Sequence, residues 1–402
     1  MKDKPIFAKT AQFQDARMAR AAGWYPYFKP IQRSQGSKVY IEDRALLMMG
    51  SNNYLGLAND PRLKEAAEEV VERYGTSCSG SRFMNGTLDL HVEFEEELAE
   101  FVGRESAVCF STGYQTNLGA LSALLGRGDH VICDKFNHAS IFDGIFLADG
   151  TKKQVTLHRY KHNSMKDLER VLSCISPEAP KLIVIDGVFS MEGDIALLPE
   201  IRALAEAYDA GVYIDEAHAL GVIGESGRGT CEYYGGGEEL ADVLMCTFSK
   251  SFGSIGGFVA GSEELIDYIR HHARSLIFSA SMPPANIAAA RKALEIMLIE
   301  PERITRLQDI AKRMLSEFRA MGFDVGTSQT PIMPIVIGDN QLTFQLWKAL
   351  YDRGIYVNPV ISPAVPPKRS LLRVSFMAVH TDSELDQFAQ VTREEAGKLG
   401  II

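Results

Sequence analysis

Lys250 is a candidate for covalent chemistry with an aldehyde. It lies in the segment TFSKSFG, residues 247–253, which directly follows an apolar run. Its neighbours are small or apolar rather than charged, and a desolvated lysine has a lowered pKa and can form a Schiff base. From this segment alone, a solvated surface lysine and a reactive lysine are equally good interpretations.

A second polar segment, DEAH at residues 215–218, follows another apolar run. A carboxylate there could simply cap the next turn. It could also pair with the protonated ring nitrogen of pyridoxal phosphate (PLP), which keeps that ring cationic. His218 would then be near the ring's phenolic oxygen. Asp215 and Lys250 at the ends of two strands of one sheet favour the PLP interpretation more than either residue does alone.

Two further segments lie after apolar runs. The segment STGYQTN, residues 111–117, has small and hydroxylic residues entering a helix, which is typical of an anion site. A plain strand-to-helix turn is the alternative, and the neighbouring motifs favour phosphate binding. His138 follows the run at 130–133 and could be structural or could stack on an aromatic cofactor. For His162 we predict a structural role.

Arg373 lies inside a C-terminal strand pattern, LLRVS at residues 371–375. An arginine flanked by Leu and Val is costly to bury without an anionic partner, and guanidinium binds carboxylates bidentately. The partner is either a protein Asp or Glu, or the carboxylate of a substrate.

These candidates need a sheet to position them. Near-continuous apolar runs at 107–110, 130–133, 181–186, 211–215, 243–246 and 257–260 alternate with helical stretches such as 198–208. This alternation predicts an α/β fold with a mostly parallel sheet whose ligands bind beyond the carboxyl ends of the strands. Asp60, Pro61 and Gly75 bound a predicted helix. From about 290 a long helical stretch toward Met321, followed by strands near 332–337 and 371–376, predicts a smaller α+β domain.

Composition limits the function classes. The chain has 402 residues, 46% apolar content and a net charge of −10, so nucleic acid is not an expected partner. Its six cysteines form no C-x-x-C pair, so no metal site is expected. The first residues show no signal peptide and no apolar run spans a bilayer, which predicts a cytoplasmic protein. Peripheral contact with a membrane stays open.

The sequence resembles the α-oxoamine synthase family of fold-type I PLP enzymes from about Gly23 to His380. The motifs that carry the resemblance are SNNYLGL at 51–57, the loop at 75–87, HAS at 138–140, DEAH at 215–218 and TFSK at 247–250. The resemblance implies an aspartate aminotransferase-like fold and a homodimer with active sites at its interface. The expected division is an N-terminal segment at 1–60, a large PLP-binding domain at 61–290 and a small C-terminal domain at 291–402.

The resemblance also implies roles for single residues. Lys250 would carry the cofactor and move the Cα proton, Asp215 would pair with the pyridine nitrogen and His218 with the phenolic oxygen, and His138 would stack on the ring. The other expected cofactor-binding residues are Thr112, Gly113, Tyr114, Ser190 and Thr247, with Ser279 and Ser281 reaching the partner subunit's phosphate. Asn52, Arg82 and Arg373 would bind substrate.

The loop at 80–87 and the segment SPAVP at 362–366 are similar to those of family members that use L-serine and a long-chain acyl-CoA. Ile361 stands where some members have an arginine. The resemblance therefore implies condensation of L-serine with palmitoyl-CoA to 3-oxosphinganine, CoA and CO₂. The alternatives are an 8-amino-7-oxononanoate synthase or a glycine C-acetyltransferase type of synthase, and an aminotransferase.

Overall fold

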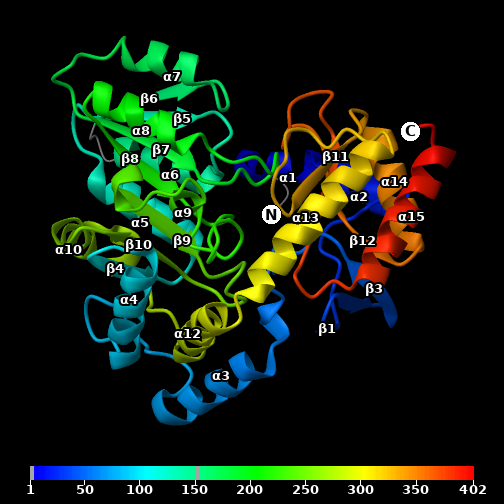
Figure 1. Cartoon of the computed structure of the whole chain (residues 1–402), viewed down its shortest axis with the longest axis horizontal. Coiled ribbons are helices and arrows are strands. Elements are labelled where there is room, and N and C mark those ends of the chain that lie inside the picture. The colour runs from blue at the N-terminus through cyan, green and yellow to red at the C-terminus, as the bar shows by residue number, and fades with distance from the viewer. Residues whose placement is uncertain (1–3, 151–153) are drawn as a thin grey trace.

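A seven-stranded sheet forms the centre of the larger of two lobes in this computed structural model, which describes residues 4–150 and 154–402 (Figure 1). The strand order is β4-β10-β9-β8-β7-β5-β6. Only β10 is antiparallel to its neighbours, so the other six strands run in one direction. The strands are β4 (Ser106–Phe110), β5 (His130–Asp134), β6 (Thr156–Tyr160), β7 (Lys181–Asp186), β8 (Ala210–Asp215), β9 (Val243–Thr247) and β10 (Gly257–Gly261).

The predicted α/β class and mostly parallel sheet are therefore confirmed, and each predicted run lies within a strand or ends beside one. The sequence prediction missed β6. Its residues Thr-Leu-His-Arg-Tyr are mostly polar, because β6 is an edge strand that is buried less completely than the central ones.

Helices cover both faces of this sheet, and successive side chains of a strand enter different cores. In β7, Ile183 and Ile185 belong to one buried cluster, whereas Val184 belongs to the other. The helices of the large lobe are α3 (Pro61–Tyr74), α4 (Asp89–Val102), α5 (Gly113–Leu124), α6 (Ala139–Ala148), α7 (Met165–Leu172), α8 (Leu198–Ala207), α9 (Thr230–Tyr233), α10 (Glu263–His272), α11 (Arg274–Ile277) and α12 (Pro284–Ile299).

The predicted helix after Asp60 is confirmed as α3. The Asp60 carboxylate accepts a hydrogen bond from the backbone N–H of Arg62, and Gly75 follows the helix with φ of 78°. The predicted single helix from about 290 to Met321 is wrong in one respect. Its residues form α12 and α13 (Glu302–Ala320), which are interrupted at Glu300 and Pro301 because proline has no N–H to continue the helical ladder.

Both ends of the chain build the smaller lobe, and α13 leads into it from the large lobe (Figure 1). One sheet contains β11 (Ile332–Val336), β14 (Leu371–Ser375) and β13 (Asn358–Val360), and the other contains β1 (Arg33–Gln35), β2 (Lys38–Ile41), β3 (Arg44–Met48) and β12 (Ile355–Tyr356). The helices outside the large lobe are α1 (Ala8–Gln12), α2 (Asp15–Ala21), α14 (Asn340–Asp352) and α15 (Asp382–Lys398). The division at residues 60 and 290 stays a proposal.

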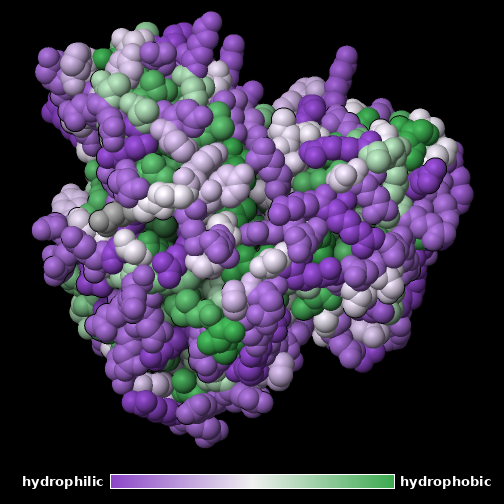
Figure 2. Space-filling model, in the orientation of Figure 1, coloured by the Kyte–Doolittle hydropathy of each residue, from purple (hydrophilic) through white to green (hydrophobic). Residues whose placement is uncertain are grey.

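The segment at 23–28, Gly-Trp-Tyr-Pro-Tyr-Phe, follows α2 as irregular chain, and its Phe28 is 92% exposed. Hydrophilic residues dominate the face in Figure 2, where hydrophobic side chains form small patches. Among the residues that the structure describes, no helix is both long and apolar enough to cross a membrane.

The central strands are expected to determine stability. Ile183→Ala removes a fully buried side chain from β7 and should lower the free energy of unfolding by about 2–5 kcal/mol. Ile299→Ala, at an exposed position in α12, should change it by less than about 0.5 kcal/mol. Denaturant unfolding of both variants measures the difference, and equal losses would contradict this account of the core.

Candidate active site

A cavity of about 290 Å³ lies where the parallel strands of the large lobe end. Eight predicted cofactor residues line it: Thr112, Gly113, Tyr114, His138, Asp215, His218, Thr247 and Lys250. They come from segments spread over more than a hundred residues of sequence, and the carboxyl ends of neighbouring strands bring them together.

Lys250 contributes an amine to this cavity. Burial is the main influence on it and lowers its pKa to about 8, while the nearby Asp215 carboxylate opposes that change. A substantial fraction of the amine is therefore neutral near physiological pH, and the neutral form is the nucleophile and the base.

The Asp215 carboxylate is almost fully buried and held by hydrogen bonds on both oxygens. Oδ2 accepts from the Asn117 side-chain amide at 2.7 Å, and Oδ1 accepts from the backbone N–H of Ala217 at 2.9 Å. Asn117 is itself fixed, because its carbonyl oxygen accepts from the Tyr213 hydroxyl at 2.8 Å and its amide also donates to Ser140 at 2.9 Å. These hydrogen bonds fix the position of the carboxylate.

Burial lowers the pKa of both cavity histidines. At His138 the Asp215 carboxylate opposes this effect and Lys250 adds to it, and at His218 both Lys250 and Arg373 add to it. The ring of His138 is hydrogen-bonded through Nδ1 to the Ser140 hydroxyl at 2.7 Å. His218 Nδ1 lies 2.7 Å from the Tyr54 hydroxyl. If Tyr54 donates this bond, Nε2 of His218 carries the proton and can donate to a group in the cavity.

The N-terminus of α5 forms one wall of the cavity. Thr112 caps this helix by accepting from the backbone N–H of Gln115, and Gly113 and Tyr114 form its first turn. A Cβ atom on Gly113 would lie 2.6 Å from Thr247 Cβ, so the backbone closely approaches the end of β9 there. The exposed N–H groups of this turn suit an anion such as a phosphate.

Arg373 comes from β14 of the small lobe and is 5% exposed. Its Nε donates to the Ser190 carbonyl at 2.6 Å, and its Nη1 donates to Asn52 at 3.0 Å and to Ser375 at 2.8 Å. Nη2 is buried without a partner among the described residues. A buried guanidinium nitrogen without an acceptor can bind an anion, and the carboxylate of a substrate would supply one.

The structure does not bring every predicted site residue to the wall of this cavity. Arg373, Ser190 and Asn52 are not among the residues that line it, and Arg373 donates hydrogen bonds to both Ser190 and Asn52. Arg82 forms a buried ion pair with Glu95 at 2.5 Å. Ser279 accepts from Gln115, and Ser281 donates to the Gly80 carbonyl. The predicted roles of Arg82, Ser279 and Ser281 stay predictions.

Five residues in or next to this cavity were assigned no role from the sequence. Asn117, Ser140 and Asp186 line it, and Tyr54 and Tyr213 bond to the lining residues His218 and Asn117. Asp186 ends β7 beside Asp215, and its carboxylate accepts from the backbone N–H of His138 at 3.1 Å. Tyr213 could have been found from strand periodicity, because residues two apart share a face of β8. Asn117 and Ser140 lie in the motifs at 111–117 and 138–140. Nothing in the sequence indicated that these two side chains bond to each other.

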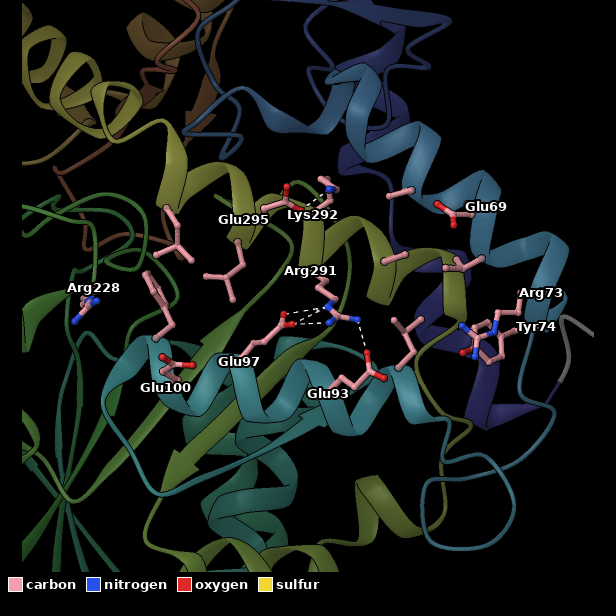
Figure 3. A pocket seen from close by; sticks show the side chains of 17 residues that line it. Glu69, Arg73, Tyr74, Glu93, Glu97, Glu100, Arg228, Arg291, Lys292 and Glu295 are labelled. Carbon is pink, nitrogen blue, oxygen red and sulfur yellow. Dashed lines mark hydrogen bonds and ion pairs between the residues drawn. The ribbon is translucent and has the colours of Figure 1, made fainter.

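A second, larger cavity of about 620 Å³ lies between α3, α4 and α12 (Figure 3). Arg291 is hydrogen-bonded there to Glu93 and Glu97, and Lys292 pairs with Glu295. These charges are satisfied by one another, and no predicted site residue lines this cavity. The cavity at the strand ends is therefore the candidate active site.

Comparison with known proteins agrees with this geometry. A family model described as aminotransferase class I and II matches residues 44–391. A serine palmitoyltransferase of Sphingobacterium spiritivorum is 49% identical over 382 residues, 94% of each chain. An 8-amino-7-oxononanoate synthase of Bacillus pumilus is 43% identical, covering 94% of this chain and 95% of that protein. A solved serine palmitoyltransferase from S. paucimobilis, with bound PLP and myriocin, has a TM-score of 0.94 and 34% identity, covering 99% of this chain and 100% of that one.

The sheet and its strand-end cavity thus have the architecture of a fold-type I PLP-dependent transferase, as the sequence predicted. The chain belongs to the aminotransferase class I and II family and, within it, to the α-oxoamine synthases.

Asn117 provides a test of how Asp215 is held. Asn117→Leu keeps a similar volume but leaves the Tyr213 hydroxyl and one Asp215 oxygen without their buried partner. We expect a loss of about 1–3 kcal/mol in the free energy of unfolding, measured by denaturant titration. A loss within error of zero would mean that Asn117 does not fix the carboxylate.

Proposed function

We propose that this chain condenses L-serine with palmitoyl-CoA to give 3-oxosphinganine, CoA and CO₂, with PLP as its cofactor. The observation that carries the proposal is the shared cavity of Lys250 and Asp215, a lowered-pKa amine beside a buried carboxylate. The choice of substrates is supported by near full-length relatives named serine palmitoyltransferase at 44–49% identity.

The residues present fit PLP. The amine of Lys250 suits its aldehyde, the Asp215 carboxylate suits its ring nitrogen, and His218 can donate to its phenolic oxygen. The first turn of α5 with Thr112, Gly113 and Tyr114, together with Thr247, suits its phosphate. When bound, PLP accepts the electron pair that remains on the substrate Cα after a proton or a carboxylate leaves.

The protein's own side chains then orient the substrate, transfer the proton and hold the cofactor ring. Arg373 holds the carboxylate of the amino acid through its free Nη2 and so orients Cα. Lys250, whose pKa is lowered to about 8, would remove the Cα proton in its neutral form and later return a proton there. His138, with its lowered pKa, presents an uncharged imidazole to stack on the aromatic ring. Asn117 and Ala217 hold the Asp215 carboxylate in place by donating hydrogen bonds to it.

We further propose that the enzyme acts as a cytoplasmic homodimer. In that assembly Ser279 and Ser281 would reach the phosphate held by the partner subunit, and Arg82 would contribute to substrate binding near the interface. Peripheral contact with a membrane stays a prediction from sequence. Size measurement in solution, together with cofactor retention in Ser279→Ala, tests the shared site.

One alternative within the family has an observation in its favour, namely the 43% identity with an 8-amino-7-oxononanoate synthase. Such an enzyme, or a glycine C-acetyltransferase type, would use alanine or glycine and a different acyl donor. An aminotransferase would instead need no CoA ester. CoA release measured across amino acids and acyl-chain lengths distinguishes all of these, and CoA release faster with glycine or alanine than with L-serine would reject the proposal.

Lys250 should be indispensable for turnover. With L-serine and palmitoyl-CoA, Lys250→Ala should release CoA about 10²–10⁴-fold more slowly, because the general base is lost. Lys292→Ala, which removes a half-buried amine of the larger cavity, should keep the wild-type rate. Normal turnover in Lys250→Ala would contradict the mechanism.

The pKa of Lys250 predicts how cofactor uptake depends on pH. Only the neutral amine attacks the aldehyde, and burial lowers its pKa to about 8. Protein freed of cofactor should therefore take up PLP faster as the pH rises through about 8, with a plateau above it. Stopped-flow absorbance measures the rate, and a rate still rising at pH 10 would show that the lysine titrates like an ordinary one.

A further inference from the structure

The loop between β7 and α8 folds into a short hairpin, residues 188–195, that supports the predicted carboxylate site. Val188 and Ile195 form a bridge, the Phe189 N–H donates to the Asp194 carbonyl at 3.0 Å, and the Gly193 N–H donates to the Phe189 carbonyl at 2.9 Å. Ser190 is next to Phe189, and its carbonyl accepts from Arg373 Nε. The position of the hairpin therefore fixes one of the acceptors that orient the Arg373 guanidinium.

His162 holds this hairpin against the sheet. Its Nε2 lies 2.9 Å from Asp194 Oδ2, and its Nδ1 lies 3.2 Å from each oxygen of Asp134 at the end of β5. The ring also contacts Phe189 edge-on, with 4.4 Å between ring centroids. Phe189 and Asp194 lie on opposite arms of the hairpin, so His162 contacts both arms.

The two carboxylate partners require the imidazole to be a cation. Ionised carboxylates only accept hydrogen bonds, so each ring nitrogen must carry a proton to bond to Asp134 and to Asp194. In agreement, the pKa of His162 is raised to about 9, because hydrogen bonds to Asp134 and Asp194 outweigh the opposing effect of burial. At neutral pH the His162 ring is therefore a charged link between two carboxylates.

The other side of the hairpin is seated on the small lobe. Thr327 donates to Asp194 Oδ2 at 3.1 Å, and Thr330 donates to the Gly193 carbonyl at 2.9 Å. Gly193 has φ of 69°, and a Cβ there would lie 2.3 Å from the Ile332 carbonyl at the start of β11. The hairpin is thus packed tightly between the strand ends of the large lobe and the small lobe that supplies Arg373.

We propose that His162 is a positioning residue for substrate recognition: it fixes hairpin 188–195 so that the Ser190 carbonyl aims Arg373 at the carboxylate of the amino acid. The inference deepens the proposed function and rests on the role assigned there to Arg373. His162 touches neither the cofactor residues nor Arg373 itself, so its effect should be specific to ligands that carry a carboxylate.

The test uses His162→Gln in the holoenzyme and compares two amines. Glutamine is neutral, so it cannot form the charged link between Asp134 and Asp194 that the His162 imidazolium forms. We expect the apparent dissociation constant for L-serine, read from the change in cofactor absorbance, to rise about tenfold. That for ethanolamine, which lacks the carboxylate, should be unchanged, as should cofactor content. His158→Gln is the matched control, because that side chain stacks on His130 and does not contact the hairpin.

Equal weakening of L-serine and ethanolamine, loss of cofactor, or no change for either amine would overturn the inference. If His162→Gln does not fold, Thr327→Val carries the same test, because it removes the small-lobe donor to Asp194 and leaves His162 in place. That variant should weaken L-serine about threefold and again leave ethanolamine unchanged.

A wrong substrate assignment would give a result that differs from a wrong role for His162. If the wild-type absorbance responds to glycine or L-alanine and not to L-serine, the substrate assignment is wrong. The comparison is then made between that amino acid and its decarboxylated amine, so that the role of His162 is decided separately.

Discussion

The site depends on the hydrogen bonds that replace water around the almost fully buried Asp215 carboxylate. An isolated buried charge is costly, and it is tolerated only when hydrogen bonds and an opposite charge replace the lost water. Asn117 and the Ala217 N–H supply those bonds, and Tyr213 and Ser140 hold Asn117 in turn. Strand β8 and helices α5 and α6 must therefore meet in one register before the carboxylate can exist in this form.

The same burial has the opposite effect on the basic groups of the cavity. It lowers the pKa of Lys250 to about 8 and keeps His138 and His218 uncharged. One low-dielectric cavity thus contains a hydrogen-bonded carboxylate, an amine whose pKa is lowered toward neutrality and uncharged histidine rings, and this combination suits acid–base chemistry near neutral pH. If the strand ends that form the cavity moved apart, water would enter and the pKa shifts of Lys250, His138 and His218 would all be lost.

The sequence predicted the central strands and the residues at their ends well, because buried parallel strands are apolar runs and the polar residues after them are easy to find. It missed β6, an edge strand rich in polar residues, and it joined α12 to α13 across Pro301. Local pattern also assigned no partner to Asn117. That side chain matters through Asp215, which is 98 residues away in sequence, and no local rule connects the two.

His162 shows the same limit most clearly. Its local sequence indicates a loop before a helix, and a structural role was the prediction. Its chemistry comes from Asp134 at the end of β5 and from Asp194 and Phe189 on the hairpin that carries Ser190. Because Arg373 comes from the small lobe and the Ser190 carbonyl from the large one, the grip on a substrate carboxylate depends on how the lobes meet. A cation fixed between two carboxylates at that junction is a direct way for the fold to hold that geometry.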